Sequence, residues 1–137
     1  MTPTARSLKL LRDRQWLAAV VEHWNPYARV RHDLFGFIDI VAINPGQDGV
    51  LGIQATTTDN QASRMKKIEH EPRALIWIQA GNRVAVWGWA KQGARNQRKL
   101  WMLTVTELHL GADPSQPWFW EQSEAICTWQ RTKLVVP

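Results

Sequence analysis

Two short apolar runs constrain the fold of this chain more than any other feature of its sequence. The first covers residues 37–43 and contains Asp39, and the second covers residues 49–53 and continues into Gln54, Ala55 and Thr56. Both are rich in β-branched residues, and a segment with asparagine, proline and glycine joins them, which predicts two neighbouring buried strands. A carboxylate in a buried strand needs a cation or hydrogen-bond donors to offset its desolvation. Asp39, facing polar side chains on the next strand, is therefore a candidate ligand of a divalent metal.

Length and composition favour one soluble domain covering residues 1–137, because 137 residues can bury a core without disulfides. A hydrophobic fraction of 45% with 21% charged residues is typical of globular proteins. The single cysteine, Cys127, suits a reducing compartment. The sequence shows neither a membrane-length apolar stretch nor an apolar signal segment after residues 1–6. We therefore expect a cytoplasmic protein without membrane association.

The positive charge of the chain is concentrated in one segment. The formal net charge is +5, but residues 60–100 contain nine lysines and arginines against two glutamates. Such a local excess suits a polyanionic partner and indicates DNA binding. The candidate DNA-binding residues are Arg64, Lys67, Arg95, Arg98 and Lys99.

The rest of the pattern predicts an α/β protein with a core at about residues 7–90 and an aromatic C-terminal extension at 100–137. The predicted elements are helix 7–24, strands 28–31, 37–43 and 49–56, helix 61–69, and strands 74–78, 84–89 and 100–110. Ser7 is the expected N-cap of the first helix, and Asn25–Pro26 is its expected end. Glu22 would lie at the border of the apolar face of that helix. The segment from Gly111 onward has no assignment.

The order helix, three strands, helix, strand resembles the core of the PD-(D/E)XK nuclease superfamily, which has a restriction-endonuclease-like αβββαβ fold. The resemblance covers residues 7–78, and the segment 33–39 looks like one in small uncharacterised phage and bacterial members. It implies a mixed central sheet flanked by helices, followed here by a C-terminal strand or loop extension. By position, Asp39 matches the strand aspartate of the family and Gln54 its second acid. Thr56 matches its lysine, and Glu22 its helix glutamate.

The resemblance implies a Mg²⁺- or Mn²⁺-dependent endonuclease that hydrolyses DNA, branched DNA included. Asp39, Glu22 and Gln54 would hold the metal, since Mg²⁺ prefers hard oxygen ligands. Thr56 cannot supply the positive charge of the family's lysine. Arg64 or Lys67 on the following helix would then have to replace it. Arg64 is our choice, because a guanidinium suits a phosphate.

Simpler roles for these acids remain open from the sequence alone. Asp39 could be a buried structural acid bonded to loop amides, and Glu22 could be a helix surface charge. We favour a surface ion pair of Asp33 with a neighbouring arginine such as Arg31 over metal binding.

Two other functions also remain open. One is the same fold acting as a nucleic-acid-binding module, weakened in catalysis at Gln54 and Thr56. The other is a phage-type protein that binds a host protein through its tryptophan-rich tail. If the chain cuts both DNA strands, a homodimer with two active sites is expected.

Overall fold

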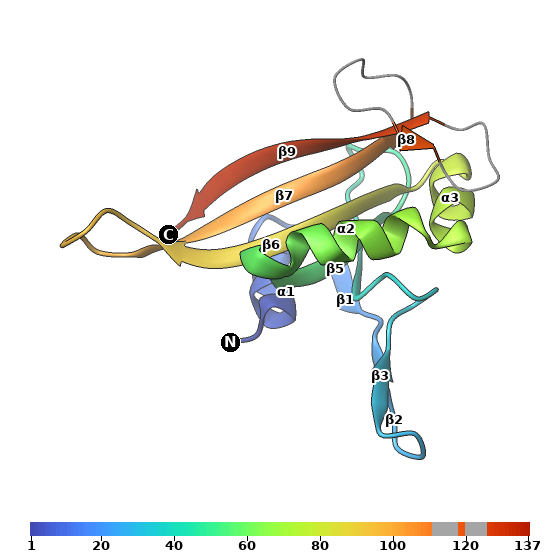
Figure 1. Cartoon of the computed structure of the whole chain (residues 1–137), viewed down its shortest axis with the longest axis horizontal. Coiled ribbons are helices and arrows are strands. Elements are labelled where there is room, and N and C mark those ends of the chain that lie inside the picture. Colours follow the sequence, from blue (N-terminus) through green and yellow to red (C-terminus); the bar gives the residue numbers. More distant parts are fainter. Residues whose placement is uncertain (111–117, 120–125) are drawn as a thin grey trace.

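A seven-stranded sheet forms the centre of the computed structural model, which describes residues 1–110, 118–119 and 126–137 (Figure 1). The strand order is β1-β4-β5-β6-β7-β9-β8. Neighbours β5 and β6 are parallel, and the other neighbouring pairs are antiparallel. The bounds are β1 Leu17–Val20, β4 Ile40–Ile43, β5 Leu51–Thr57, β6 Arg83–Gln92, β7 Leu100–Leu110, β8 Trp118–Phe119 and β9 Ile126–Val136. The protein is therefore α/β with a mixed central sheet, as the sequence predicted.

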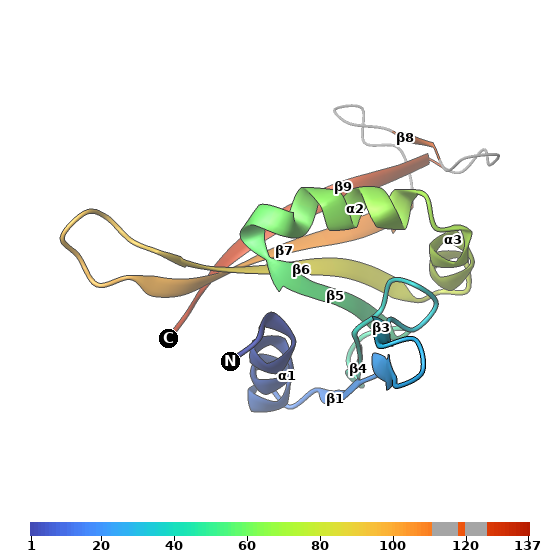
Figure 2. The ribbon, with the colours of Figure 1, turned by 60° about the horizontal axis from the view of Figure 1, so that its bottom comes forward.

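Helices cover both faces of this sheet (Figure 2). Helix α1, Pro3–Asp13, lies against one face, and α2, Gln61–Glu69, lies against the other. A short 3₁₀ turn, Thr58–Asn60, leads into α2, and α3, Pro72–Gln79, follows it. The N-terminus of α1 is capped by Thr2, whose side chain accepts a hydrogen bond from the Ala5 amide.

The sheet separates two apolar cores, and β6 contributes residues to both. Leu51 and Ile53 belong to the core under α1, together with Leu11 of that helix. On the opposite face, Ile68 of α2 packs in a second core that also contains Phe37. Side chains along a strand point alternately to its two faces. Gln54 and Thr56 therefore face α2.

Strands β2, His23–Asn25, and β3, Val30–His32, form a separate two-stranded hairpin between β1 and β4. The hairpin extends away from the body of the molecule (Figure 1). The strand expected at 28–31 is present as β3, which begins two residues later and ends one residue later. The Asn25–Pro26 pair, expected to end a helix, instead begins the turn of this hairpin.

The predicted helix 7–24 is wrong, because the helix begins earlier and ends at Asp13. Gln15 has a φ of 66°, which turns the chain toward β1 at the sheet edge. The apolar residues from Leu17 onward fitted the helical period, but they also suit a strand with one covered face. Ser7 is not the cap: it is buried within α1, where its hydroxyl donates to the Pro3 carbonyl and accepts from Trp89 Nε1.

The predicted strand at 74–78 is also wrong, because this segment belongs to helix α3. Pro72 occupies the first turn of α3, where its missing N–H costs nothing. Glu71 caps the helix by accepting from the Arg73 amide. A short apolar run does not by itself distinguish a buried strand from one side of a helix.

Other sequence-based expectations are confirmed. Helix 61–69 and strand 100–110 have the predicted bounds. The strand expected at 37–43 is shorter, since β4 begins at Ile40 after an isolated bridge between Leu34 and Ile38. Strand β9 was not predicted, and it pairs with β7 along its whole length. Residues 111–117 and 120–125 of the aromatic tail lie outside the described residues.

Candidate metal centre

Asp39 lies directly before β4, and backbone hydrogen bonds hold it to the chain segments on either side. Its amide donates to the Ile53 carbonyl of β5 at 2.8 Å, and its carbonyl accepts from the Val21 amide at 2.8 Å. The side chain is only 3% exposed. Its Oδ2 accepts hydrogen bonds from Gln54 Nε2 at 2.8 Å and from the Ala55 amide at 2.9 Å. The sequence-based pairing of Asp39 with Gln54 is thus present.

Two further carboxylates join Asp39. Glu22 and Asp33 each offer an oxygen, and the ligand atoms of the three residues all lie within 4.8 Å of one another. Both side chains are 16% exposed. We call Glu22, Asp33 and Asp39 the acid cluster. Glu22 belongs to it, as expected, but it reaches the cluster from the link between β1 and β2 and not from a helix.

Asp33 corrects our preference for a surface pair with a neighbouring arginine. Its Oδ2 accepts from Lys67 Nζ at 3.2 Å, whereas Arg31 Nη1 donates to Glu22 Oε1 at 3.1 Å. Glu22 directly precedes β2, and Asp33 directly follows β3. Pairing of these strands therefore brings the two carboxylates together, a long-range effect that the sequence pattern did not reveal.

The acid cluster retains a proton at neutral pH. Burial raises the pKa of Asp39 to about 8, and a hydrogen bond with Asp33 adds to the rise. Burial also acts to raise the pKa of Asp33, but hydrogen bonds with Asp39 and Lys67 outweigh it, so this pKa lies below its usual value. Neighbouring carboxylates ionise unequally in this way because their charges repel. A cation bound among them would remove the same repulsion.

Gln54 leaves one oxygen unsatisfied beside the acid cluster. The residue is 4% exposed, and its Oε1 is buried without a hydrogen-bond partner, while its Nε2 donates to Asp39. Buried polar atoms without partners are uncommon in folded proteins and mark places where a ligand or water belongs. Three carboxylates and an amide oxygen form a set of hard donors that suits Mg²⁺ or Mn²⁺. The residues present thus fit a divalent metal.

Thr56 lies two residues beyond Gln54 on the same face of β5 and is 5% exposed. In the register of β5 with β6 it stands beside Gly88. A Cβ on Gly88 would lie 2.2 Å from Gln61 Cδ. Gln61, at the start of α2, donates through Nε2 to the Thr104 carbonyl at 2.9 Å and so ties α2 to the sheet. This role of Gln61 was not predicted from the sequence, where Gly88 was the available signal for it.

The two cations considered on α2 differ in their surroundings. Lys67 makes the contact with Asp33, although its side chain is 44% exposed. The Nε of Arg64 is buried and has no hydrogen-bond partner. Lys67 is thus a cation that touches the acid cluster, while Arg64, our sequence-based choice, has an unsatisfied donor.

The basic residues Arg95, Arg98 and Lys99 are exposed in the loop that joins β6 to β7. This loop extends beyond the sheet at the end far from α3, as expected for a hairpin arm (Figure 1).

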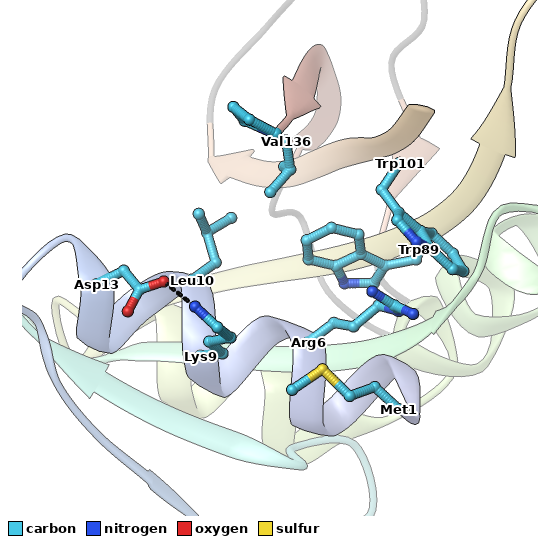
Figure 3. A pocket seen from close by; sticks show the side chains of 9 residues that line it. Met1, Arg6, Lys9, Leu10, Asp13, Trp89, Trp101 and Val136 are labelled. Atoms are coloured by element: carbon cyan, nitrogen blue, oxygen red, sulfur yellow. Dashed lines mark hydrogen bonds and ion pairs between the residues drawn. The ribbon is translucent and has the colours of Figure 1, made fainter. Parts of the chain in front are cut away.

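A pocket of about 180 Å³ lies under α1, on the other face of the sheet (Figure 3). Its acid, Asp13, is paired with Lys9, and the Arg6 guanidinium lies 3.5 Å from the ring centre of Trp101. Among the described residues, Asp13 is therefore the one carboxylate side chain that lines this pocket, whereas the acid cluster brings three carboxylates together.

Comparisons with protein-family models, curated proteins and solved structures find no match for this chain. Among the described residues, no helix is both long enough and apolar enough to cross a membrane.

Proposed function

We propose that this protein is a DNA endonuclease that depends on Mg²⁺ or Mn²⁺. The observation that carries the proposal is the acid cluster, with three carboxylate oxygens within 4.8 Å of one another next to the unpaired Oε1 of buried Gln54. A glutamine with a purely structural role would be expected to have its buried amide oxygen satisfied by a donor. Clustered acids of this kind, with a strongly shifted pKa, are typical of functional sites.

The order of elements supports a restriction-endonuclease-like core. Helix α1 is followed by β1, β4 and β5, which pair antiparallel. Helices α2 and α3 come next, and then β6, which pairs parallel to β5. The β2–β3 hairpin would be an insertion in this core, and β7 to β9 an extension of its sheet. In such a core, Asp39 and Gln54 would occupy the positions of the family's two strand acids.

Each residue of the site would have a distinct part in the reaction. Asp39, Asp33 and Glu22 would hold the metal, with the carbonyl oxygen of Gln54 as a neutral ligand. When bound, such a metal supplies positive charge at the reacting phosphate and lowers the pKa of a bound water. Lys67, held near the acids by Asp33, would place an ammonium beside the phosphate and partly replace the lysine that Thr56 lacks.

The position of Thr56 also supports a second candidate, a nucleic-acid-binding module with weak or no catalysis. Its hydroxyl brings no charge to a buried place where the family has a lysine. The exposed cations of the β6–β7 loop would serve DNA binding in either case, by contacting phosphates.

Plasmid and branched DNA incubated with Mg²⁺ or Mn²⁺, and in parallel with EDTA, test the proposal. We expect cleavage with either metal, none with EDTA, and loss of at least about a hundredfold in rate for Asp39→Asn. Asp13→Asn is the matched control, since Asp13 is an acid of similar size on α1 that pairs with Lys9. Metal binding without cleavage would favour the binding module. Equal cleavage by wild type and Asp39→Asn would contradict the proposed site.

A further inference from the structure

The β2–β3 hairpin is anchored at the acid cluster by both of its ends. Glu22 directly precedes β2 and Asp33 directly follows β3. Between these two carboxylates the chain leaves the sheet, forms the projecting hairpin and returns (Figure 1). Whatever binds along the hairpin is therefore brought next to the proposed metal ligands.

The tip of the hairpin presents an aromatic ring on a rigid turn. Tyr27 is 98% exposed. The Asn25 side chain accepts hydrogen bonds from the amides of Tyr27 at 3.0 Å and Ala28 at 3.2 Å. Pro26 restricts the backbone between Asn25 and Tyr27. A ring held in this way loses little conformational entropy when it binds a flat partner.

A second aromatic ring lies on the side of the hairpin that leads to the acids. Trp24 is 55% exposed and stands directly opposite Arg31, so the two side chains share one face. On that face Arg31 Nη1 donates to Glu22 Oε1 at 3.1 Å. Trp24 is two residues from Glu22, about 7 Å along an extended chain.

The charge of the hairpin indicates which kind of partner these rings fit. Residues 23–32 contain Arg29, Arg31 and two histidines, and no aspartate or glutamate. Exposed apolar residues on a projecting segment mark a contact surface. Aromatic rings alternating with cations are the arrangement that binds single-stranded nucleic acid, with phosphates on the cations and bases stacked on the rings.

We infer that the hairpin binds unpaired nucleotides of a DNA substrate, whose bases stack on Tyr27 and Trp24. This binding would direct the proposed nuclease to ends, gaps or branch points. The inference rests on the proposed function for its link to cleavage. In a regular duplex the faces of the bases are covered by their neighbours, and exposing them costs a few kcal/mol per base. Unpaired bases reach the rings without that cost. A base on Trp24 would belong to a nucleotide close to the phosphate at the acid cluster.

Binding without metal tests the hairpin separately from catalysis. Fluorescence anisotropy in EDTA would compare a labelled oligo(dT) strand with a fully paired duplex of equal length. Replacing both rings, Trp24→Ala with Tyr27→Ala, should weaken binding of the single strand about tenfold or more and that of the duplex less than about twofold. Both side chains are exposed, so the double variant should keep its fold, which circular dichroism would check.

Two matched variants separate stacking from charge. Tyr27→Phe should bind the single strand within about twofold of wild type, because the ring that stacks is retained. Arg29→Gln should weaken both DNAs to a similar extent and reduce the salt dependence of binding, as loss of a phosphate contact does.

The inference is overturned if the double variant binds both DNAs as wild type does, or loses affinity for both equally. A second result would also overturn it: light scattering shows a dimer for wild type and a monomer for the double variant, and both bind DNA equally. The rings would then serve self-association. Selective binding of oligo(dT) without cleavage in Mg²⁺ would instead contradict the proposed nuclease and leave the role of the hairpin supported.

Discussion

The two faces of the central sheet differ in the acidic groups that they bury. Under α1, the buried hydroxyl of Ser7 accepts from Trp89 Nε1, and the neighbouring Asp13 is paired with Lys9. Under α2, Asp39 is buried next to two more carboxylates, and Gln54 Oε1 has no partner. Strand β5 supplies both faces through alternate residues. The α1 face also has buried polar atoms without partners, Arg6 Nε and Trp87 Nε1. Among the described residues, however, only the α2 face combines such an atom with clustered carboxylates, which a bound cation would stabilise.

The largest expected difference between the faces is in metal affinity. We expect Asp33→Asn to lower the affinity for Mn²⁺ by about tenfold to a hundredfold, because it removes one of three charged ligands. Asp13→Asn should change it less than twofold. Isothermal titration calorimetry measures both. Unchanged affinity in Asp33→Asn would return Asp33 to the role of a surface ion pair with Lys67.

The apolar face should respond most strongly in stability. Leu11 is 2% exposed in the core under α1. Leu11→Ala should lower the free energy of unfolding by about 2–5 kcal/mol, through lost burial and the cavity left behind. Urea denaturation followed by circular dichroism measures the change. A loss below about 1 kcal/mol would show that α1 is not held by this core.

Asp39→Asn should have the opposite effect, and stabilise the metal-free protein. The pKa of Asp39 is about 8 in the folded chain, against an ordinary value of 3.8 for an aspartate. The folded state therefore binds the extra proton between these pH values, and its stability falls as pH rises from about 4 to about 8. Asparagine does not titrate, and its amide can donate to the neighbouring carboxylates.

The stability difference between Asp39→Asn and wild type should therefore grow with pH and level off above about pH 8. The ionisation of Asp39 depends on that of Asp33, whose lowered pKa offsets part of the effect. We therefore expect a gain on the order of 1 kcal/mol near pH 8, less than the shift of Asp39 alone would give. Urea denaturation in EDTA at several pH values measures it. A gain that is constant across pH would mean that Asp39 is ionised throughout.

The sequence was sufficient for the parts of the fold that depend on local pattern. Helix 61–69 and the pairing of Asp39 with Gln54 followed from periodicity and from two neighbouring apolar runs. The helix expected at 7–24 and the strand at 74–78 failed because short apolar runs fit either period, and the packing around them decided. Asp33 was underrated because its place in the acid cluster depends on the β2–β3 hairpin, which the expected helix had hidden.

The smallest expected effect on stability, and the finest test of the α2 face, concerns Lys67 and Arg64. Lys67→Met removes an exposed partner of Asp33 and should change the free energy of unfolding by less than about 1 kcal/mol. If its ammonium assists the phosphate in the transition state, turnover should fall at least about tenfold while KM changes little, since only transition-state binding is lost. Arg64→Met, one turn earlier on the same helix, is the matched control. The opposite result, lost turnover in Arg64→Met with normal turnover in Lys67→Met, would assign the role of the missing lysine to Arg64, the residue that the sequence favoured. The buried, unpaired Nε of Arg64 would then be the donor that binds the substrate.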